Sequence, residues 1–299
     1  MFQGSIVALV TPMKADGAID WAAFDRLLDF HLTEGTDGLV IAGTTGESAV
    51  LTREESIALV ARAREKSAGR IPVIAGSGSN CTRRTIELSQ ASQDAGADAL
   101  LVVTPYYNKP TQQGMYLHFT SVADAVSIPV VLYNVPSRTA VDLLPETVVR
   151  LAAHPRIAAI KEATGIVSRA REILAGARAG FVVLSGDDPT VVDLIEAGAG
   201  GVISVTGNVV PRALHELCAL ALAGRFEQAR ELDARLRNLH KSMFLESNPI
   251  PVKWSLARLG LIGDALRLPL TQLAPAYHEP LQQALREAGV SLPDAGSSV

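Results

Sequence analysis

Cysteine and the signals of export or membrane insertion are nearly absent from this chain of 299 residues. Its two cysteines, Cys81 and Cys218, form no CxxC pair and are too few for a disulfide framework, which favours a reducing compartment. The first residues, MFQGSIVALVTPM, lack a basic region, and no uninterrupted apolar stretch approaches the ~20 residues of a membrane span. We therefore expect a cytoplasmic protein with no membrane partner.

Signals for several other kinds of partner are missing as well. The net charge is -4 and no basic stripe is present, which argues against binding of nucleic acid. The six histidines show no HxH or HExxH spacing, so we expect no metal site. The run GSGS (76–79) lacks the third glycine of a dinucleotide fingerprint. What the chain does have is 48% hydrophobic and 19% charged residues, enough for a large globular core.

Eight short apolar runs recur along the chain: SIVALVTP (5–12), GLVIAG (38–43), IPVIAGSG (71–78), ALLVVTP (99–105), PVVLYNVP (129–136), IAAIKEAT (157–164), FVVLSGDD (181–188) and GVISVTGN (201–208). Near-continuous hydrophobicity is typical of parallel strands, which are buried on both faces. The segments between them carry helical signals, such as Asp20 as an N-cap and Thr52 with Glu55 as a capping box. This alternation predicts an α/β fold, a (β/α)8 TIM barrel, although an open doubly wound sheet would show the same periodicity.

After Val209 the pattern changes to helices only, with candidates at 211–222, 225–242, 250–260 and 272–288. No linker rich in Pro, Gly or Ser separates them from the preceding part of the chain. We therefore expect a barrel over residues 1–224 and a C-terminal helical subdomain over residues 225–299 that packs on it.

Lys161 is the sharpest chemical signal, because the chemistry of such barrels collects at the carboxyl ends of the strands. Of six lysines it alone continues an apolar run of strand type. Burial of an ammonium group can lower a lysine pKa by up to ~5 units, and the neutral amine can then attack a carbonyl to form an iminium. The alternative is a structural ion pair with Asp187 or Glu162.

Other polar residues end neighbouring runs. Tyr133 ends the run before that of Lys161, so its hydroxyl could move protons there, or it could be a core residue with a wet tip. The turn GTTG (43–46) offers N–H groups and two hydroxyls to a carboxylate, or is a simple βα turn. Arg138 could hold a second carboxylate, or be an ordinary surface arginine. Asp187 and Asp188 would repel a phosphorylated substrate.

Several motifs together resemble the dihydrodipicolinate synthase family, within the N-acetylneuraminate lyase superfamily. They are GTTGES (43–48), VTPYYN (103–108), LYNVPSRT (132–139), IKEATG (160–165), LSGDD (184–188), GVISVTGN (201–208) and NPIPVKW (248–254). The likeness covers nearly the whole chain in family order. It implies condensation of pyruvate with aspartate semialdehyde through a lysine Schiff base, in the diaminopimelate route to lysine, with no metal or organic cofactor.

The resemblance also assigns roles to individual residues. Lys161 would form the pyruvate imine, Thr45 and its N–H would bind the pyruvate carboxylate, and Tyr133 would transfer protons. The remaining roles concern the proton relay (Thr44 and Tyr107), the semialdehyde carboxylate (Arg138) and the pocket lining (Gly186 and Ile203). The tyrosine matching Tyr107 reaches into a neighbouring subunit's site in this family, so a homo-oligomer is implied, a tetramer built as a dimer of dimers.

A possible effector site follows from the same resemblance. Its residues match the lysine-feedback site of lysine-sensitive members: Ser48, Ala49, Asn80 and Tyr106. Three further positions depart from that pattern: Arg53, Ser56 and Arg84. An arginine in place of a carboxylate repels the ammonium of lysine by ~1 kcal/mol at 4 Å in water and ~4 kcal/mol in a shielded cleft, so we expect weak inhibition by lysine.

Two rival functions remain at this stage. Another pyruvate-dependent Schiff-base aldolase, such as an N-acetylneuraminate lyase, would share the lysine, but the lyases usually lack the arginine at Arg138. A non-catalytic barrel used as a binding protein is the other, because a fold alone does not establish a function. It predicts no covalent adduct with pyruvate.

Overall fold

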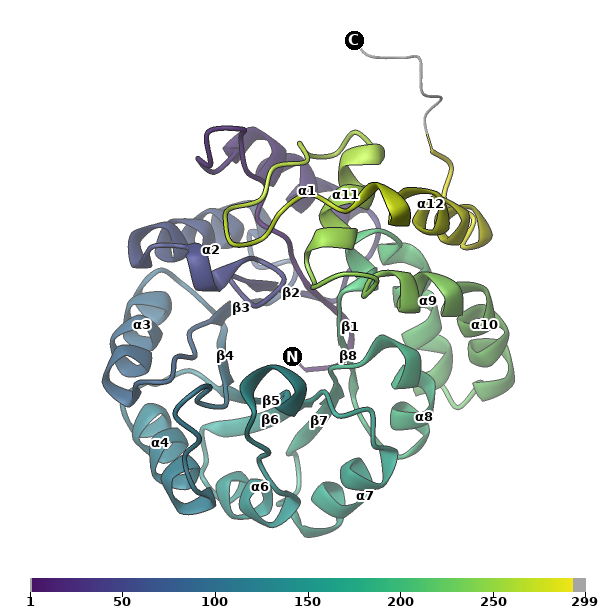
Figure 1. Cartoon of the computed structure of the whole chain (residues 1–299). Helices are drawn as coiled ribbons and strands as arrows, with labels where there is room; N and C mark the ends of the chain where they lie inside the picture. The colour runs from purple at the N-terminus through teal and green to yellow at the C-terminus, as the bar shows by residue number, and fades with distance from the viewer. Residues whose placement is uncertain (1, 293–299) are drawn as a thin grey trace.

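The eight apolar runs form the eight strands of a closed parallel barrel in the computed structural model, which describes residues 2–292 (Figure 1). The strands are β1 (Gly4–Ala8), β2 (Gly38–Ile41), β3 (Val73–Gly76), β4 (Ala99–Val103), β5 (Val130–Asn134), β6 (Ile157–Glu162), β7 (Val182–Ser185) and β8 (Gly201–Ser204). The pairing of β1 with β8, where Ile6 lies opposite Ile203, closes the ring and excludes the open sheet. The predicted TIM barrel is confirmed.

Helices connect the strands and surround the ring in Figure 1. The helices of the barrel are α1 (Trp21–Thr33), α2 (Arg53–Ser67), α3 (Thr82–Asp94), α4 (Gln112–Asp124), α5 (Pro136–Thr139), α6 (Pro145–Ala152), α7 (Val167–Gly176), α8 (Val191–Glu196) and α9 (Pro211–Leu222). Short 3-10 helices follow β2 (η1, Ser48–Val50), β7 (η2, Asp188–Thr190) and β8 (η3, Thr206–Asn208). Both predicted N-terminal caps are present, since Asp20 accepts the N–H of Ala23 and Thr52 forms a capping box with Glu55.

Alternate strand residues face opposite sides of the barrel wall, which explains why the runs are apolar throughout. Ile6 and Ala8 pack in the barrel interior, in the same cluster as Tyr133, whereas Val7 and Leu9 pack against the surrounding helices. Because each strand is buried on both faces, its residues are nearly all apolar, and polar and apolar residues do not alternate along it. Polar residues enter only where the strands end.

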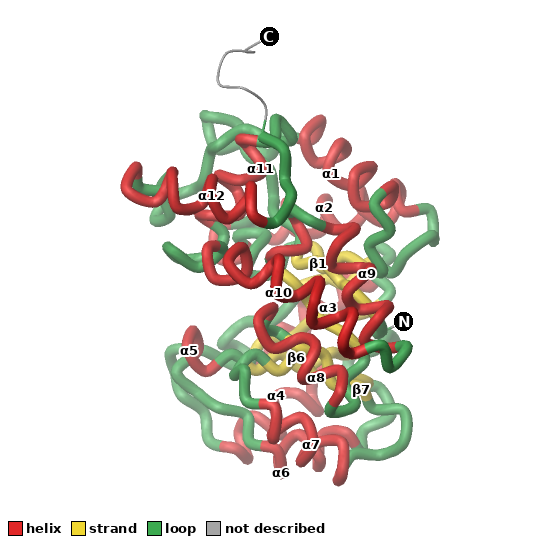
Figure 2. Tube along the Cα trace, turned by 90° about the vertical axis from the view of Figure 1, so that its right-hand side faces the viewer, coloured by secondary structure: helices red, strands yellow, loops and turns green. Residues whose placement is uncertain are grey.

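The C-terminal helices are α10 (Phe226–Ser242), α11 (Ile250–Arg258) and α12 (His278–Glu287), with η4 (Pro275–Tyr277) before the last. Figures 1 and 2 both place α11 beside α1, over one side of the ring. The helix predicted at 272–288 begins six residues late, because prolines at 275 and 280 lack the N–H that regular helical hydrogen bonding needs. The division at residue 225 stays a prediction, and the end of that subdomain, residues 293–299, lies outside the described residues.

No helix within residues 2–292 is both long and apolar enough to cross a bilayer.

Candidate active site

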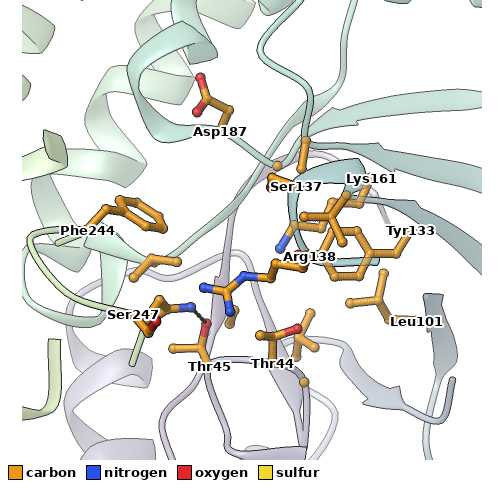
Figure 3. Close-up of a pocket in the computed structure, with 18 residues that line it drawn as sticks. Thr44, Thr45, Leu101, Tyr133, Ser137, Arg138, Lys161, Asp187, Phe244 and Ser247 are labelled. Carbon is orange, nitrogen blue, oxygen red and sulfur yellow. Dashed lines mark hydrogen bonds between the residues drawn. The ribbon is translucent and has the colours of Figure 1, made fainter. Parts of the chain in front are cut away.

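A cavity of about 600 Å³ opens at the carboxyl ends of the strands. Six of the predicted site residues line it: Thr44, Thr45, Tyr133, Arg138, Lys161 and Gly186. They come from four separate loops or strand ends, which the closed barrel brings to one place (Figure 3). The cavity is therefore the candidate active site.

The amine of Lys161 lies inside this cavity without a charged partner. The side chain is 5% exposed, and Nζ is 4.5 Å from the centroid of the Tyr133 ring, which stands opposite it in the β5–β6 pairing. Neither alternative ion pair is present within residues 2–292, because Glu162 pairs with Arg169 and Asp187 accepts a hydrogen bond from Thr190. A lysine side chain that lies in a cavity and is not tied up in an ion pair is accessible to a carbonyl compound.

Gly186 is required where the Lys161 side chain packs. A Cβ atom at this position would lie 3.0 Å from both Cγ and Cε of Lys161 and 2.6 Å from Cβ of Ala163. Distances this short mean that even alanine would push the lysine chain out of place. The absence of a side chain at Gly186 thus fixes the course of the lysine.

The turn after β2 presents hydrogen-bond donors to the cavity. The N–H of Glu47 donates to the carbonyl of Thr44 at 3.0 Å, and Glu47 itself adopts a left-handed φ of 58°. Within the described chain the N–H groups of Thr44 and Thr45 have no acceptor, so both are available to a ligand. Free N–H groups on a tight turn can contribute to the binding of an anion.

Arg138 brings a guanidinium group to the same cavity. It is carried by the short helix α5 directly after β5, and its guanidinium points into the cavity (Figure 3). It makes no ion pair with any residue between 2 and 292. A guanidinium held this way can bind a carboxylate through two parallel hydrogen bonds.

Asp187 lines the same cavity, and burial raises the pKa of its carboxyl above the usual value. The hydroxyl of Thr190 opposes this shift by donating to Oδ2 at 2.7 Å. Its neighbour Asp188 points elsewhere and accepts the N–H groups of Val205 and Thr206. One acidic residue therefore lines the cavity, with its carboxyl turned away from Lys161 and Arg138 (Figure 3).

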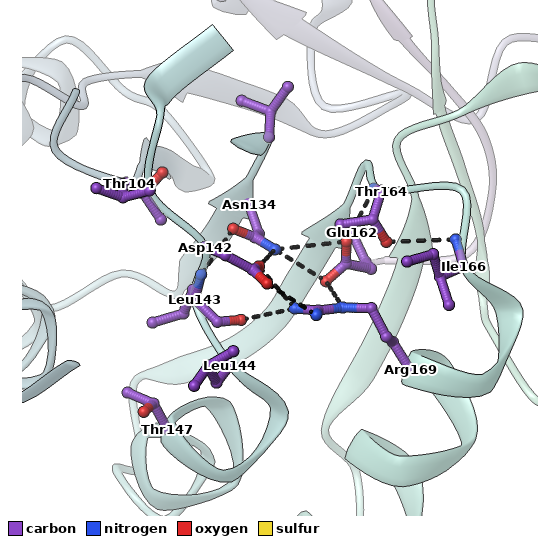
Figure 4. Close-up of polar contacts among 12 residues, drawn as sticks. Thr104, Asn134, Asp142, Leu143, Leu144, Thr147, Glu162, Thr164, Ile166 and Arg169 are labelled. Carbon is purple, nitrogen blue, oxygen red and sulfur yellow. Dashed lines mark hydrogen bonds and ion pairs between the residues drawn. The ribbon is translucent and has the colours of Figure 1, made fainter. Parts of the chain in front are cut away.

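A buried polar network lies at the ends of β5 and β6, on the helix-facing side of the barrel (Figure 4). The Glu162 carboxylate accepts from Asn134 Nδ2 at 3.2 Å, from the Thr164 N–H at 2.9 Å and from Arg169 Nε at 3.3 Å. Arg169 also binds Asp142 through two hydrogen bonds of 3.0 and 2.8 Å. Because Asn134 and Glu162 directly follow Tyr133 and Lys161, the network holds the ends of β5 and β6 together.

Two predicted site residues lie outside the cavity. Ile203 is 1% exposed in the barrel interior, and Val205, two residues further on, lines the cavity instead. Tyr107 is 87% exposed in the single chain, with a left-handed φ of 72°. The roles that the family resemblance gives these two residues stay predictions.

A second cavity of about 520 Å³ adjoins the first and shares Thr44, Tyr133 and Arg138 with it. Most residues of the predicted effector site line this cavity: Ser48, Ala49, Tyr106, Arg53, Ser56 and Arg84. Asn80 is not among the lining residues, and its carbonyl accepts a hydrogen bond from Asn108 at 2.8 Å. Arg53 and Arg84, which depart from the lysine-binding pattern, thus both line this cavity.

Sequence reasoning missed the contribution of the C-terminal segment. Phe244, Ser247 and Asn248 line the cavity, and Asn248 Nδ2 donates to Thr45 Oγ1 at 2.9 Å. A fully buried ion pair joins Lys253 of α11 to Glu47 at 2.5 Å. The motif NPIPVKW includes Asn248 and Lys253 and supported the family resemblance, but it did not predict either contact, and no sequence signal pointed to Phe244 or Ser247.

Among residues 2–292, no group of three or more His, Cys, Asp or Glu side chains is placed to hold a metal ion.

The fold and the cavity define a class: barrels that present a buried lysine at the carboxyl ends of the strands, an arrangement suited to imine chemistry on carbonyl compounds. The model of the dihydrodipicolinate synthetase family matches residues 1–288. The chain belongs to this family.

Relatives and solved structures agree over almost the full length. The 4-hydroxy-tetrahydrodipicolinate synthases of Ectopseudomonas mendocina and Pseudomonas aeruginosa are 57% and 56% identical, each covering 97% of this chain and 99% of the relative. A structure of the chloride-inhibited dihydrodipicolinate synthase of Acinetobacter baumannii with pyruvate matches with a TM-score of 0.96 at 50% identity, covering 97% of this chain and 100% of that one. The dihydrodipicolinate synthase of Cyanidioschyzon merolae with lysine bound matches with a TM-score of 0.94 at 37% identity, covering 97% and 99%.

Proposed function

We propose that the protein has 4-hydroxy-tetrahydrodipicolinate synthase activity, condensing pyruvate with L-aspartate 4-semialdehyde in the diaminopimelate route to lysine. The observation that carries this proposal is the Lys161 amine, which is buried beside Tyr133 in the cavity and makes no ion pair with the part of the chain that the structure describes. The identity of 57% to a relative with this activity selects the reaction among those that an imine can support.

The reaction balances without an added oxidant, reductant or metal. The Lys161 amine adds to the ketone of pyruvate and water leaves, which forms an iminium. Loss of a methyl proton gives an enamine, whose carbon attacks the aldehyde carbon of the second substrate. The amine of the semialdehyde then attacks the iminium carbon, closes the ring and releases the lysine. The iminium itself is the electron sink, so we propose that no cofactor takes part.

The two substrate carboxylates have separate places in this scheme. The hydroxyl and the N–H of Thr45 bind the carboxylate of pyruvate, because Thr45 lines the cavity and its N–H has no acceptor within residues 2–292. Arg138 binds the carboxylate of the semialdehyde. The charge of Asp187 disfavours a third anionic group, such as a phosphate.

Proton transfer and assembly are the finer parts of the proposal. Tyr133, whose ring centroid is 4.5 Å from the Lys161 amine, exchanges protons with that amine in this proposal, and Thr44 and Tyr107 continue the relay. The exposure of Tyr107 in a single chain supports its insertion into a neighbouring subunit, within a tetramer built as a dimer of dimers. One solved relative is described as a monomeric variant, so family membership alone does not fix the oligomer. The proposed compartment is the cytoplasm.

Reductive trapping tests the imine directly. Incubation with pyruvate and borohydride should increase the protein mass by one reduced pyruvate, and peptide mapping should place the label on Lys161. The variant Lys161→Ala should gain no mass, whereas Lys253→Met, which changes the other buried lysine, should still be labelled if it folds. A label elsewhere, or none in the wild type, contradicts the proposal.

A substrate panel tests the second reactant. Consumption of pyruvate should depend on aspartate semialdehyde, and the reverse assay with N-acetylneuraminate should release no pyruvate. Cleavage of N-acetylneuraminate at a comparable rate would assign the protein to the lyases instead.

A further inference from the structure

Asn248, from the far end of the chain, makes the one side-chain hydrogen bond recorded for Thr45 within residues 2–292. Its Nδ2 lies 2.9 Å from Thr45 Oγ1, and 203 residues separate the two (Figure 3, dashed line). Both residues line the cavity, with exposures of 6% and 2%. The contact thus joins the C-terminal segment to the residue proposed to bind the pyruvate carboxylate.

The direction of this hydrogen bond decides what Thr45 offers to a ligand. A hydroxyl has one proton to donate and two lone pairs that accept. Because Asn248 donates, it occupies a lone pair, and the proton has no acceptor in the described chain. That proton is left for the cavity. A carboxylate can only accept, so the polarity matches an anionic ligand.

The buried ion pair between Lys253 and Glu47 holds the two partners in place. Lys253 lies one helical turn beyond Pro249, which directly follows Asn248, and its N–H donates to the carbonyl of Pro249 at 2.9 Å. Glu47 belongs to the same turn as Thr45, and both charged side chains are 0% exposed. The donor and the acceptor are therefore carried by two segments that a second contact fixes against each other.

We propose that Asn248 is a positioning residue for the keto-acid carboxylate, committing the hydroxyl proton of Thr45 to the substrate by donating to its oxygen. The inference rests on the proposed function for the identity of the ligand. Asn248 acts through Thr45 and does not touch the reacting atoms.

A double-mutant cycle tests this role. The variants are Asn248→Leu, which keeps the size and removes the donor, Thr45→Val, and the two combined. Loss of one oriented hydrogen bond to a charged group corresponds to about 10-fold or more in affinity, so Asn248→Leu should raise the half-saturating pyruvate concentration in trapping by that factor. The KM for the semialdehyde should stay near the wild-type value. In the Thr45→Val background, Asn248→Leu should add nothing.

Two controls separate positioning from folding. Asn248→Ala replaces Asn248→Leu if the larger side chain prevents folding, which circular dichroism reports. Asn238→Ala removes an exposed amide of α10 that donates to Glu287 at 2.6 Å, and it should leave pyruvate saturation unchanged.

The outcomes distinguish this inference from the proposed function. Independent, multiplicative effects of the two substitutions would overturn it, as would a rise confined to the semialdehyde KM or wild-type saturation in both Asn248 variants. Absence of any adduct in the wild type would instead refute the proposed function.

Discussion

The ion pair between Glu47 and Lys253 offers the strongest test of the energetics. Replacing Lys253 by Met keeps most of the side-chain volume and removes the ammonium. Glu47 is then left as a buried carboxylate whose remaining partner is the N–H of Arg267 at 3.2 Å. Replacing Glu47 by Gln leaves the ammonium buried instead. Each single substitution therefore leaves one charged group without its partner at a site where both side chains are 0% exposed.

The expected magnitudes follow from the geometry. At 2.5 Å and an effective dielectric constant of ~20, the attraction is about 7 kcal/mol, and the lost hydration of the two ions offsets most of it. Either single substitution should therefore lower the free energy of unfolding by about 3 to 5 kcal/mol. The double variant Glu47→Gln/Lys253→Met should lose much less than the sum, because no charge is left unpaired.

The pH dependence of Glu47→Gln provides a second check with a definite sign. Burial lowers the pKa of Lys253, and the Glu47 charge opposes that shift, so the variant should hold a neutral lysine over a wider pH range. The unfolded chain keeps the usual pKa of 10.5 and binds the proton, so stability rises with pH below that value. The loss in Glu47→Gln should be larger at pH 6 than at pH 9.

Urea unfolding followed by circular dichroism, at one protein concentration, measures all four proteins of the cycle. A coupling energy below about 1 kcal/mol would refute the reasoning, because it would mean that each charge finds water or another partner once the first is removed.

Three further predictions follow from contacts outside the cavity. Arg169→Met removes the cation from the buried Glu162 carboxylate and should lower the free energy of unfolding in urea by about 3 kcal/mol. L-lysine should inhibit the synthase assay weakly, because Arg53 and Arg84 line the second cavity, and half-inhibition at micromolar lysine would contradict this. Burial lowers the pKa of His31 to about 3 and that of His118 to about 4. Their unfolded-state pKa of 6.5 is higher, so stability should fall by about 2 kcal/mol for each between pH 7 and pH 5, and a flat urea profile over that range would exclude this effect.

The strands and the reacting pair were predictable because their signals are local. Each apolar run needs only a few residues to indicate a strand covered on both faces, and the order of the runs places the end of β5 beside that of β6. Tyr133 and Lys161 were therefore expected to lie close, and they stand opposite each other in the pairing. The depth at which each residue sits was not predictable, since Ile203 lies below the cavity and Val205 at its wall.

The contribution of the C-terminal helices could not be read from the sequence. Periodicity identifies a helix and its apolar face, but it does not say which distant turn that face meets. Lys253 occurs in a helical segment, where a lysine is ordinarily a surface residue, and only the position of α11 over the β2 turn makes it a buried partner. For the same reason, the contact between Asn248 and Thr45 could not be predicted from the sequence.

The hydrogen bond between Asn248 and Thr45 has a consequence for protein synthesis. The two residues are separated by 203 positions, and a ribosome adding ~10 residues per second needs about 20 s to pass from one to the other. All eight strands emerge before the last wall of the cavity does. A nascent chain thus carries Lys161 well before it can orient the Thr45 hydroxyl, and the partner of the buried Glu47, Lys253, is synthesised later still.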